Sequence, residues 1–196
     1  DLGLAATYGV LAGSAVTSAG KTGTKVYGDV GVHPGSAVDG FPPAECFGAI
    51  DAGNAAAGDA KADLVTAYNA AAARASTNIL SGQDLGGMTL SRGVFTYDST
   101  ATLNGDLTLD ALGDVSSVWI FQIASALNIA QSGRVIFKDG LGNADNVYFQ
   151  VGSSVTVSYN ADILGNYMAF QAITVATGAA VNGRLLARNA AVTLDF

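Results

Sequence analysis

The amino-acid sequence predicts a mainly β fold, a three-sided β-solenoid with one long α-helix packed alongside it. The first indication is a triplet repeated at intervals of 18 and 19 residues: Val155-Thr156-Val157, Ile173-Thr174-Val175 and Val192-Thr193-Leu194. The second is that two further strand-like triplets follow at matching offsets, in a fixed order. The third is a single Ala-rich stretch with helical periodicity. Short internal repeats of this kind are typical of stacked coils.

Residues 1–40 are expected to form short strands separated by glycine corners. Val26–Val32 shares the form apolar-x-Gly-x-apolar-x-apolar with Leu103–Leu109 and Val181–Ala187. Glycine suits a corner where the backbone needs a positive φ or leaves no room for a Cβ. Pro42 and Pro43 then end the regular structure.

One helix is expected from about residue 50 to residue 76. Its apolar positions recur every 3.6 residues, and they are Ala60, Leu64, Ala67, Tyr68, Ala71 and Ala75. Asp59 and Asp63 lie early and Arg74 lies late, as the helix dipole favours. A single helix must bury its apolar stripe, and a face of the solenoid is the only partner that the sequence offers.

Strands are expected to resume near residue 85 and to continue to residue 196, with Val118–Ile123 and Val147–Val151 as aligned neighbours. The loops at 111–114 and 139–143 have the composition of turns. A chain of 196 residues is long enough for one sizeable core, so we expect a single domain over residues 1–196.

The composition limits the possible partners. Charged residues make up 13% of the chain, against an average of about 25%, and the net charge is −7. Nucleic-acid binding needs a basic face and is not expected. No apolar run reaches the roughly 18 residues that would span a membrane, so no membrane partner is expected either. Cys46 is the only cysteine and is expected to be a small buried residue, while His33 beside Pro34 is expected to be a structural or surface histidine.

The repeated triplets predict a regular outer surface. Because successive strand residues point to opposite faces, the apolar residues of each triplet fill the tube and Thr156, Thr174 and Thr193 point outward in line. Hydrogen-bonded neighbouring strands would space these threonines by roughly 4.7–4.9 Å. Asn104 and Asn182, beside corner glycines, form a rival ladder on a second face.

Six stretches that span nearly the whole chain resemble the microbial ice-binding (antifreeze) protein family: Val30–Phe41, Ala62–Ala71, Leu85–Val94, Trp119–Ile123, Phe149–Ser154 and Val181–Leu194. The resemblance implies a right-handed β-helix of triangular section, a helix on one side and ice binding by a flat face. It also implies that N-terminal strands insert beside C-terminal ones, so that the coils are not stacked in chain order.

In some members of that family the flat face carries a loose Thr-(Ala/Gly)-x-(Thr/Asn) repeat. Six segments of this chain keep its fourth position: Ser14–Thr17, Gly86–Thr89, Ser125–Asn128, Ser153–Thr156, Gln171–Thr174 and Ala190–Thr193. The ice-contacting residues implied by this resemblance are Ser14, Thr17, Thr89, Ser125, Asn128, Ser153, Ser154, Thr156, Ser158, Ala172, Thr174, Ala176, Ala191 and Thr193.

Catalysis is not expected. β-Solenoid lyases and hydrolases need paired carboxylates, or a carboxylate with Arg or Lys, in a cleft. Glu45 is the only glutamate, and Asp29 and Asp106 follow glycine at what look like equivalent corners. The sequence shows no catalytic or metal-binding motif, and no cofactor is expected. We therefore expect a secreted, monomeric protein whose partner is the ice crystal surface; a carbohydrate-binding or adhesin-type module remains the alternative.

Overall fold

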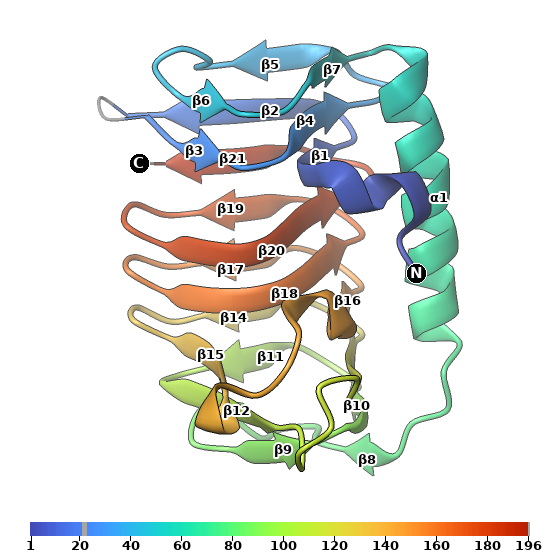
Figure 1. The fold of residues 1–196 in the computed structure, drawn as a ribbon, viewed down its shortest axis with the longest axis vertical. Helices are drawn as coiled ribbons and strands as arrows, with labels where there is room; N and C mark the ends of the chain where they lie inside the picture. Colours follow the sequence, from blue (N-terminus) through green and yellow to red (C-terminus); the bar gives the residue numbers. More distant parts are fainter. Residues whose placement is uncertain (21–22, 196) are drawn as a thin grey trace.

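The computed structural model describes residues 1–20 and 23–195 and is a right-handed, three-sided β-helix with one α-helix along its outside (Figure 1). Every strand pairing in this part of the chain is parallel, as stacked coils require. The predicted fold class is confirmed. We name the three sides the threonine side, the helix side and the third side.

The threonine side is a seven-stranded sheet of short strands. Their order is β11 (Ala101–Leu103), β14 (Leu127–Ile129), β17 (Val155–Val157), β19 (Ile173–Val175), β21 (Val192–Asp195), β2 (Ala15–Ala19) and β5 (Ala37–Asp39). Figure 1 shows these strands stacked one above another along the length of the molecule.

A twelve-stranded sheet bends around a corner to form most of the other two sides. The helix side contains β8 (Asn78–Ile79), β10 (Gly93–Tyr97), β13 (Trp119–Ile123), β16 (Val147–Val151), the second halves of β18 (Asp162–Ala169) and β20 (Ala180–Ala187), then β1 (Tyr8–Ala12), β4 (Asp29–Val32) and β7 (Ile50–Ala52). The third side contains β9 (Thr89–Ser91), β12 (Asp106–Asp110), β15 (Arg134–Phe137), the first halves of β18 and β20, and the separate pair β3 (Lys25–Val26) and β6 (Glu45–Cys46). Short 3-10 helices cover Gly3–Thr7 (η1), Lys138–Gly140 (η2) and Ala144–Asn146 (η3).

The N-terminal coils stack beyond the C-terminal ones, as the family resemblance implied. β1 lies between β20 and β4, and β2 lies between β21 and β5. In register, Val10 pairs with Leu185 and Thr17 pairs with Thr193. Strands from the two ends of the sequence therefore share one continuous stack.

Two of the three predicted corner glycines, Gly105 and Gly183, have positive φ, and Gly165 in the neighbouring coil does too. Gly105 (φ +101°) precedes β12 at the corner between the threonine side and the third side. Gly165 (φ +113°) and Gly183 (φ +152°) lie inside β18 and β20, at the next corner. Gly28 has no positive φ, but a Cβ there would lie 2.8 Å from the backbone nitrogen of Gly9. Both reasons for expecting glycine at these corners are therefore present.

The tube is filled by inward-pointing apolar side chains, among which four aromatic rings form a continuous stack. Phe95, Phe121, Phe149 and Tyr167 occupy one register position on β10, β13, β16 and β18. Successive ring centroids lie 5.2, 4.6 and 4.6 Å apart. All four rings are buried, so they link neighbouring coils by packing as well as by backbone hydrogen bonds.

The helix, α1, covers Ala55–Ala72 and is shorter than the sequence indicated. Residues 50–52 are strand β7, and Arg74 and Ala75 lie beyond the helix. The predicted dipole pairing is wrong, because the first turn holds no acidic residue and the last turn no basic one. The side chain of Asn54 caps the helix instead, accepting from the Ala57 N–H at 3.0 Å.

The apolar stripe of α1 packs on the outside of the helix side, as predicted. Buried Leu64 and Tyr68 form a second hydrophobic cluster with residues of η1, β1, β18 and β20. Asp63 also fixes η1, since its carboxylate accepts from the Leu4 N–H at 2.7 Å.

Cys46 is half-buried rather than buried. Its thiol donates to the Gly28 carbonyl at 3.3 Å.

One charged side chain, Lys61, is buried between α1 and the solenoid. Its ammonium donates to the carbonyls of Ala187 and Arg188 at 2.5 and 2.6 Å. Burial, together with the charge of Arg188, nevertheless lowers the pKa of Lys61 from 10.5 to about 8. The folded state therefore favours the neutral amine more than the unfolded chain does.

This difference predicts a pH-dependent stability. Between pH 8 and 10.5 the unfolded chain holds the Lys61 proton more often than the folded chain does, so the free energy of unfolding rises with pH. We expect a rise of about 2 kcal/mol between pH 7 and 9.5, measured by denaturant unfolding. In the Lys61→Met variant this rise should disappear; a variant that keeps the full rise would show that Lys61 is not its source.

Candidate functional site

The threonine side carries one outward row of small polar residues in unbroken register. Across its seven strands the Cα partners follow in the order Thr102, Asn128, Thr156, Thr174, Thr193, Thr17 and Asp39. Within this row the Thr17 hydroxyl donates to that of Thr193 at 3.4 Å. Six intervals between hydrogen-bonded strands give the row a length of roughly 29 Å.

Two flanking rows of small side chains run beside the central row. The row two residues earlier in each strand contains Ala126, Ser154, Ala172, Ala191, Ala15 and Ala37. The row two residues later contains Ala130, Ser158, Ala176, Asp195 and Ala19. Almost all of these positions hold Ala, Ser or Thr, so the side chains of the threonine side have nearly uniform height.

Charge is scarce on this surface. The seven strands contain no Lys, Arg or His, and their only carboxylates are those of Asp39 and Asp195. Ion pairs gather on the third side instead, where Arg134 pairs with Asp106, and Lys138 pairs with Asp110 at 2.7 Å. Hydrogen bonds from Arg134 hold the pKa of Asp106 below its usual value.

The structure places all but one of the predicted contact residues on the threonine side. Thr17, Asn128, Thr156, Thr174 and Thr193 form its central row. The flanking rows hold the predicted Ser154, Ser158, Ala172, Ala176 and Ala191. Ser14, Ser125 and Ser153 lie at the edge where the chain enters each strand.

Thr89 is the exception, and its placement in the row is wrong. It lies in β9 on the third side, in register with Thr108. In the coil that contains Thr89, the residue aligned with the central row is Asp84, which forms an isolated β-bridge with Thr102. The chain then turns through Gly87 (φ +79°), so the segment Gly86–Thr89 spans the corner and Thr89 lies beyond it, at the start of β9.

Thr102 is the row member that the sequence motif missed. It ends the segment Ser99-Thr100-Ala101-Thr102, which keeps the fourth position of the repeat but has threonine instead of Ala or Gly at the second. Its register with Asn128 places it in the central row. A search that allowed any small residue at the second position would have found it.

The rival asparagine ladder does not exist in the structure. Asn104 precedes Gly105 at the edge of the threonine side, whereas Asn182 lies in β20 beside the next corner. Asp106, Arg134, Asp162 and Ala180 occupy one register position on four neighbouring strands. Asn104 lies two residues before this position and Asn182 lies two residues after it, so the two asparagines are not aligned. Asp29 and Asp106 are likewise not equivalent, since Asp29 begins β4 on the helix side.

Residues 1–20 and 23–195 contain no group of three or more His, Cys, Asp or Glu side chains arranged to hold a metal ion. Within the same part of the chain, no helix combines the length and hydrophobicity that crossing a lipid bilayer requires.

The sequence model of a family described as ice-binding-like matches residues 10–196. The chain belongs to this family. A member from Nostoc sp. (strain HG1), an ice-binding protein, is 43% identical over 195 residues, which are 99% of this chain and 71% of that protein. The ice-binding protein of Flavobacterium frigoris (strain PS1) is 31% identical, over 100% of this chain and 74% of its own length.

Solved structures of ice-binding-like proteins share the whole fold. An ice-binding protein from an Antarctic biological consortium superposes with a TM-score of 0.95 at 41% identity, covering 100% of this chain and 87% of the other. The ice-binding protein of the Antarctic ascomycete Antarctomyces psychrotrophicus gives a TM-score of 0.94, also at 41% identity, with 100% and 94% coverage. The resemblance stated from the sequence is confirmed at the level of family and fold.

Proposed function

We propose that this protein binds ice through the threonine side and thereby inhibits ice growth and recrystallisation. The observation that carries the proposal is the central row, in which six Thr or Asn side chains on six adjacent strands stand in unbroken register. The ice-binding activity of its relatives supports the same assignment.

The chemistry of the row suits a crystalline partner. Ice presents a periodic, uncharged array of water oxygens, and ionic side chains would hold disordered hydration shells against it. Threonine offers a hydroxyl that can join such a lattice and a methyl that is weakly hydrated. Each contact is small, since a buried CH₂ contributes about 0.8 kcal/mol.

Many weak contacts add up because the surface is already ordered. The row is fixed by parallel strands above a packed core, so that binding immobilises few side chains and the entropic cost is low. Waters held between the three rows would have positions close to those of the lattice, and bridging waters are nearly as favourable as direct hydrogen bonds. An adsorbed molecule then forces the growing front to curve around it, and growth stops.

We infer a secreted, monomeric protein without catalytic activity that binds neither nucleic acid nor membrane. The net charge of −7 supports the absence of nucleic-acid binding, which needs a basic face.

The appearance of a growing ice crystal tests the function against the carbohydrate-binding alternative. In a solution of this protein a single crystal held just below its melting point should become faceted, and growth should stay arrested over a measurable thermal hysteresis gap. A crystal that remains a round disc, together with specific binding on a glycan array, would favour the alternative.

The proposal also predicts a gain of activity at the end of the row. Asp39 occupies the seventh position, in register with Thr17, and is exposed. We expect Asp39→Thr to extend the row by one position and raise thermal hysteresis by roughly a fifth or more, since one further contact joins six on an already ordered surface. Asp59→Thr, on the exposed face of α1, should change nothing. A stable Asp39→Thr variant with unchanged or lower hysteresis would contradict the prediction.

A further inference from the structure

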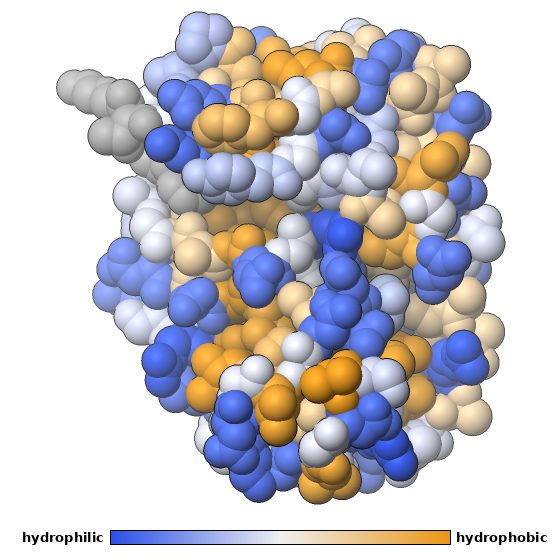
Figure 2. Space-filling model, viewed as in Figure 1, coloured by the Kyte–Doolittle hydropathy of each residue, from blue (hydrophilic) through white to orange (hydrophobic). Residues whose placement is uncertain are grey.

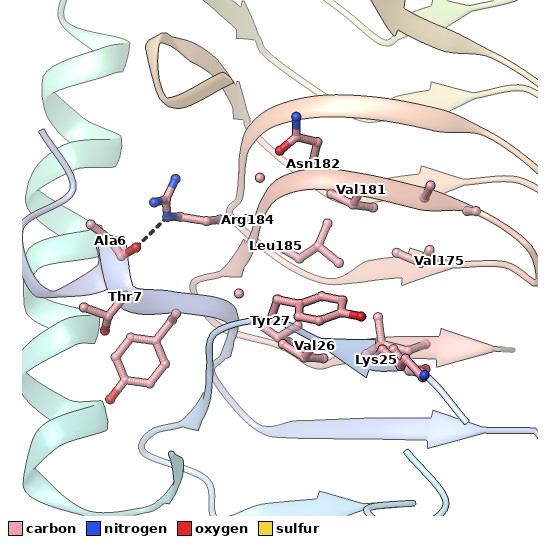
Figure 3. Close-up of a pocket in the computed structure, with 18 of the residues that line it drawn as sticks. Ala6, Thr7, Lys25, Val26, Tyr27, Val175, Val181, Asn182, Arg184 and Leu185 are labelled. Carbon is pink, nitrogen blue, oxygen red and sulfur yellow. Dashed lines mark hydrogen bonds between the residues drawn. The ribbon is translucent and has the colours of Figure 1, made fainter. Parts of the chain in front are cut away.

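The third side lacks one strand. The coil that contains β1 and β2 contributes a strand to the helix side and to the threonine side, but the residues before β1 form η1 and turn toward α1 (Figure 1). On the third side, the first half of β20 and strand β3 therefore face each other, and no strand formed by the described residues lies between them. Figure 3 shows Lys25, Val26 and Tyr27 at one edge of this gap and Val181, Asn182 and Leu185 at the other.

The gap is a cavity of about 540 Å³ that opens to the surface. Its floor is the interior of the β-helix, with Val26, Val175 and Leu194 among the lining residues. Figure 2 shows hydrophobic residues at the bottom of a hollow on this face. Where the strand is missing, the cavity reaches inward to the core side chains of Val26, Val175 and Leu194, which are themselves at most 6% exposed.

Among residues 1–20 and 23–195, the backbone groups on both edges of the gap have no strand partner. In a parallel sheet, alternate residues direct their N–H and C=O groups to opposite neighbours. The carbonyls of Thr24 and Val26 accept from β6, so the peptide groups of Lys25 point into the gap. The Ala180 N–H donates to the carbonyl of Ala161, the residue before β18, so Val181 directs its groups into the gap from the other edge. A gap of one missing strand is roughly 9–10 Å wide, twice the spacing of neighbouring strands.

The occupied edge of β3 shows which side chains this strand accepts. Lys25 lies opposite Glu45 of β6, with a nitrogen–oxygen distance of 4.0 Å. Inward-pointing Val26 lies beside Cys46. Tyr27 stacks on Phe47 with ring centroids 4.8 Å apart and ring planes within 4°. An acidic, an apolar and an aromatic residue in succession therefore complement β3.

The same three positions are free on the other edge of β3. Tyr27 is 79% exposed, although Phe47 covers one face of its ring. The Lys25 side chain is 59% exposed, and Glu45 is its nearest carboxylate partner. A strand in the gap would thus meet a cation, an apolar interior and an aromatic face, in that order along the chain.

We propose that this gap is a binding site for an extended segment of a partner protein with the sequence acidic–apolar–aromatic. The segment adds a strand parallel to β3 and β20 and completes the third side by β-augmentation. Its acidic residue pairs with Lys25, its apolar residue enters the interior beside Val26 and Val181, and its aromatic residue stacks on Tyr27. This binding is separate from any contact with ice, because it uses another side of the molecule.

Labelled synthetic peptides test the proposal by fluorescence anisotropy. The probes are fluorescein-Gly-Ser-Glu-Val-Tyr-Ser-Gly and its counterpart with lysine in place of glutamate. Wild-type protein should bind the glutamate peptide weakly but measurably below millimolar concentration, as suits a very small interface. It should prefer this peptide to the lysine peptide about five-fold, which is the upper range for an exposed ion pair.

Variants of β3 identify the site. Lys25→Glu should reverse the preference between the two peptides, and Tyr27→Ala should weaken both. Arg74→Glu, a matched charge reversal beyond the helix, should leave binding as in wild type. On adding the glutamate peptide, the amide NMR signals of Lys25, Val181 and Gly183 should shift. Binding of neither peptide at millimolar concentration, or a preference that Lys25→Glu leaves unchanged, would overturn the proposal.

Discussion

Replacing Thr156 with tyrosine is expected to remove about 80% or more of the thermal hysteresis while leaving the fold intact, because short-range contacts fall steeply once a gap opens. Thr156 is exposed at the third of seven positions in the central row, between Asn128 and Thr174. A phenol ring would stand above its neighbours and hold the surrounding surface away from the lattice. A separation of even 0.5–1 Å forfeits a quarter to a half of each dispersion contact.

The matched control is Thr108→Tyr. Thr108 lies in β12 on the third side, between β9 and β15 and in register with Thr89 and Ile136, and is partly exposed like Thr174 and Thr193 of the central row. This variant should keep wild-type hysteresis, because its tyrosine stands on the third side, which is not expected to contact ice. If Thr108→Tyr were the variant that lost activity while Thr156→Tyr kept it, the third side would be the ice-binding face.

The largest expected effect on stability comes from Phe149→Ala. The Phe149 ring is 1% exposed and lies between those of Phe121 and Tyr167, at 4.6 Å from each centroid. Truncation removes both contacts and leaves a cavity that the strands cannot collapse into without losing register. We expect a loss of about 3–5 kcal/mol in the free energy of unfolding, measured by chemical denaturation.

A surface phenylalanine provides the comparison. Phe47 is 59% exposed, so Phe47→Ala should cost about 1 kcal/mol or less. A cost below about 1 kcal/mol for Phe149→Ala would show that the aromatic stack does not hold the coils together. If both variants lost several kcal/mol, the exposed Tyr27–Phe47 pair would be part of the core in solution.

The elements that the sequence predicted well are those governed by local pattern. The triplets around Thr156, Thr174 and Thr193 follow each other at nearly constant spacing, because β18 and β20 belong to coils of almost equal length. Their register in the structure confirms the predicted alignment. The helix was recognisable from its apolar spacing, although its ends were set by Asn54 and by strand β7 rather than by charge.

The elements that sequence patterns missed depend on pairings between distant residues. Coils with longer loops break the 18-residue period: 26 residues separate Thr102 from Asn128, and 28 separate Asn128 from Thr156. Where the repeat period is lost, a threonine in a matching motif can lie on any of the three sides of the β-helix. The prediction that Thr89 lies on the threonine side is wrong for this reason, since Thr89 lies on the third side. The pairing of Thr17 with Thr193 is equally invisible to periodicity and came only from the family resemblance.

Partition of the protein between growing ice and liquid tests most directly whether frozen water is the ligand of the threonine side. Three samples are slowly frozen onto a cold finger: wild type, Thr174→Asp in the central row, and Thr66→Asp on the exposed face of α1. Wild type and Thr66→Asp should be enriched in the ice fraction, while Thr174→Asp should stay in the liquid. A folded Thr174→Asp protein that enters the ice as completely as wild type would contradict the assignment.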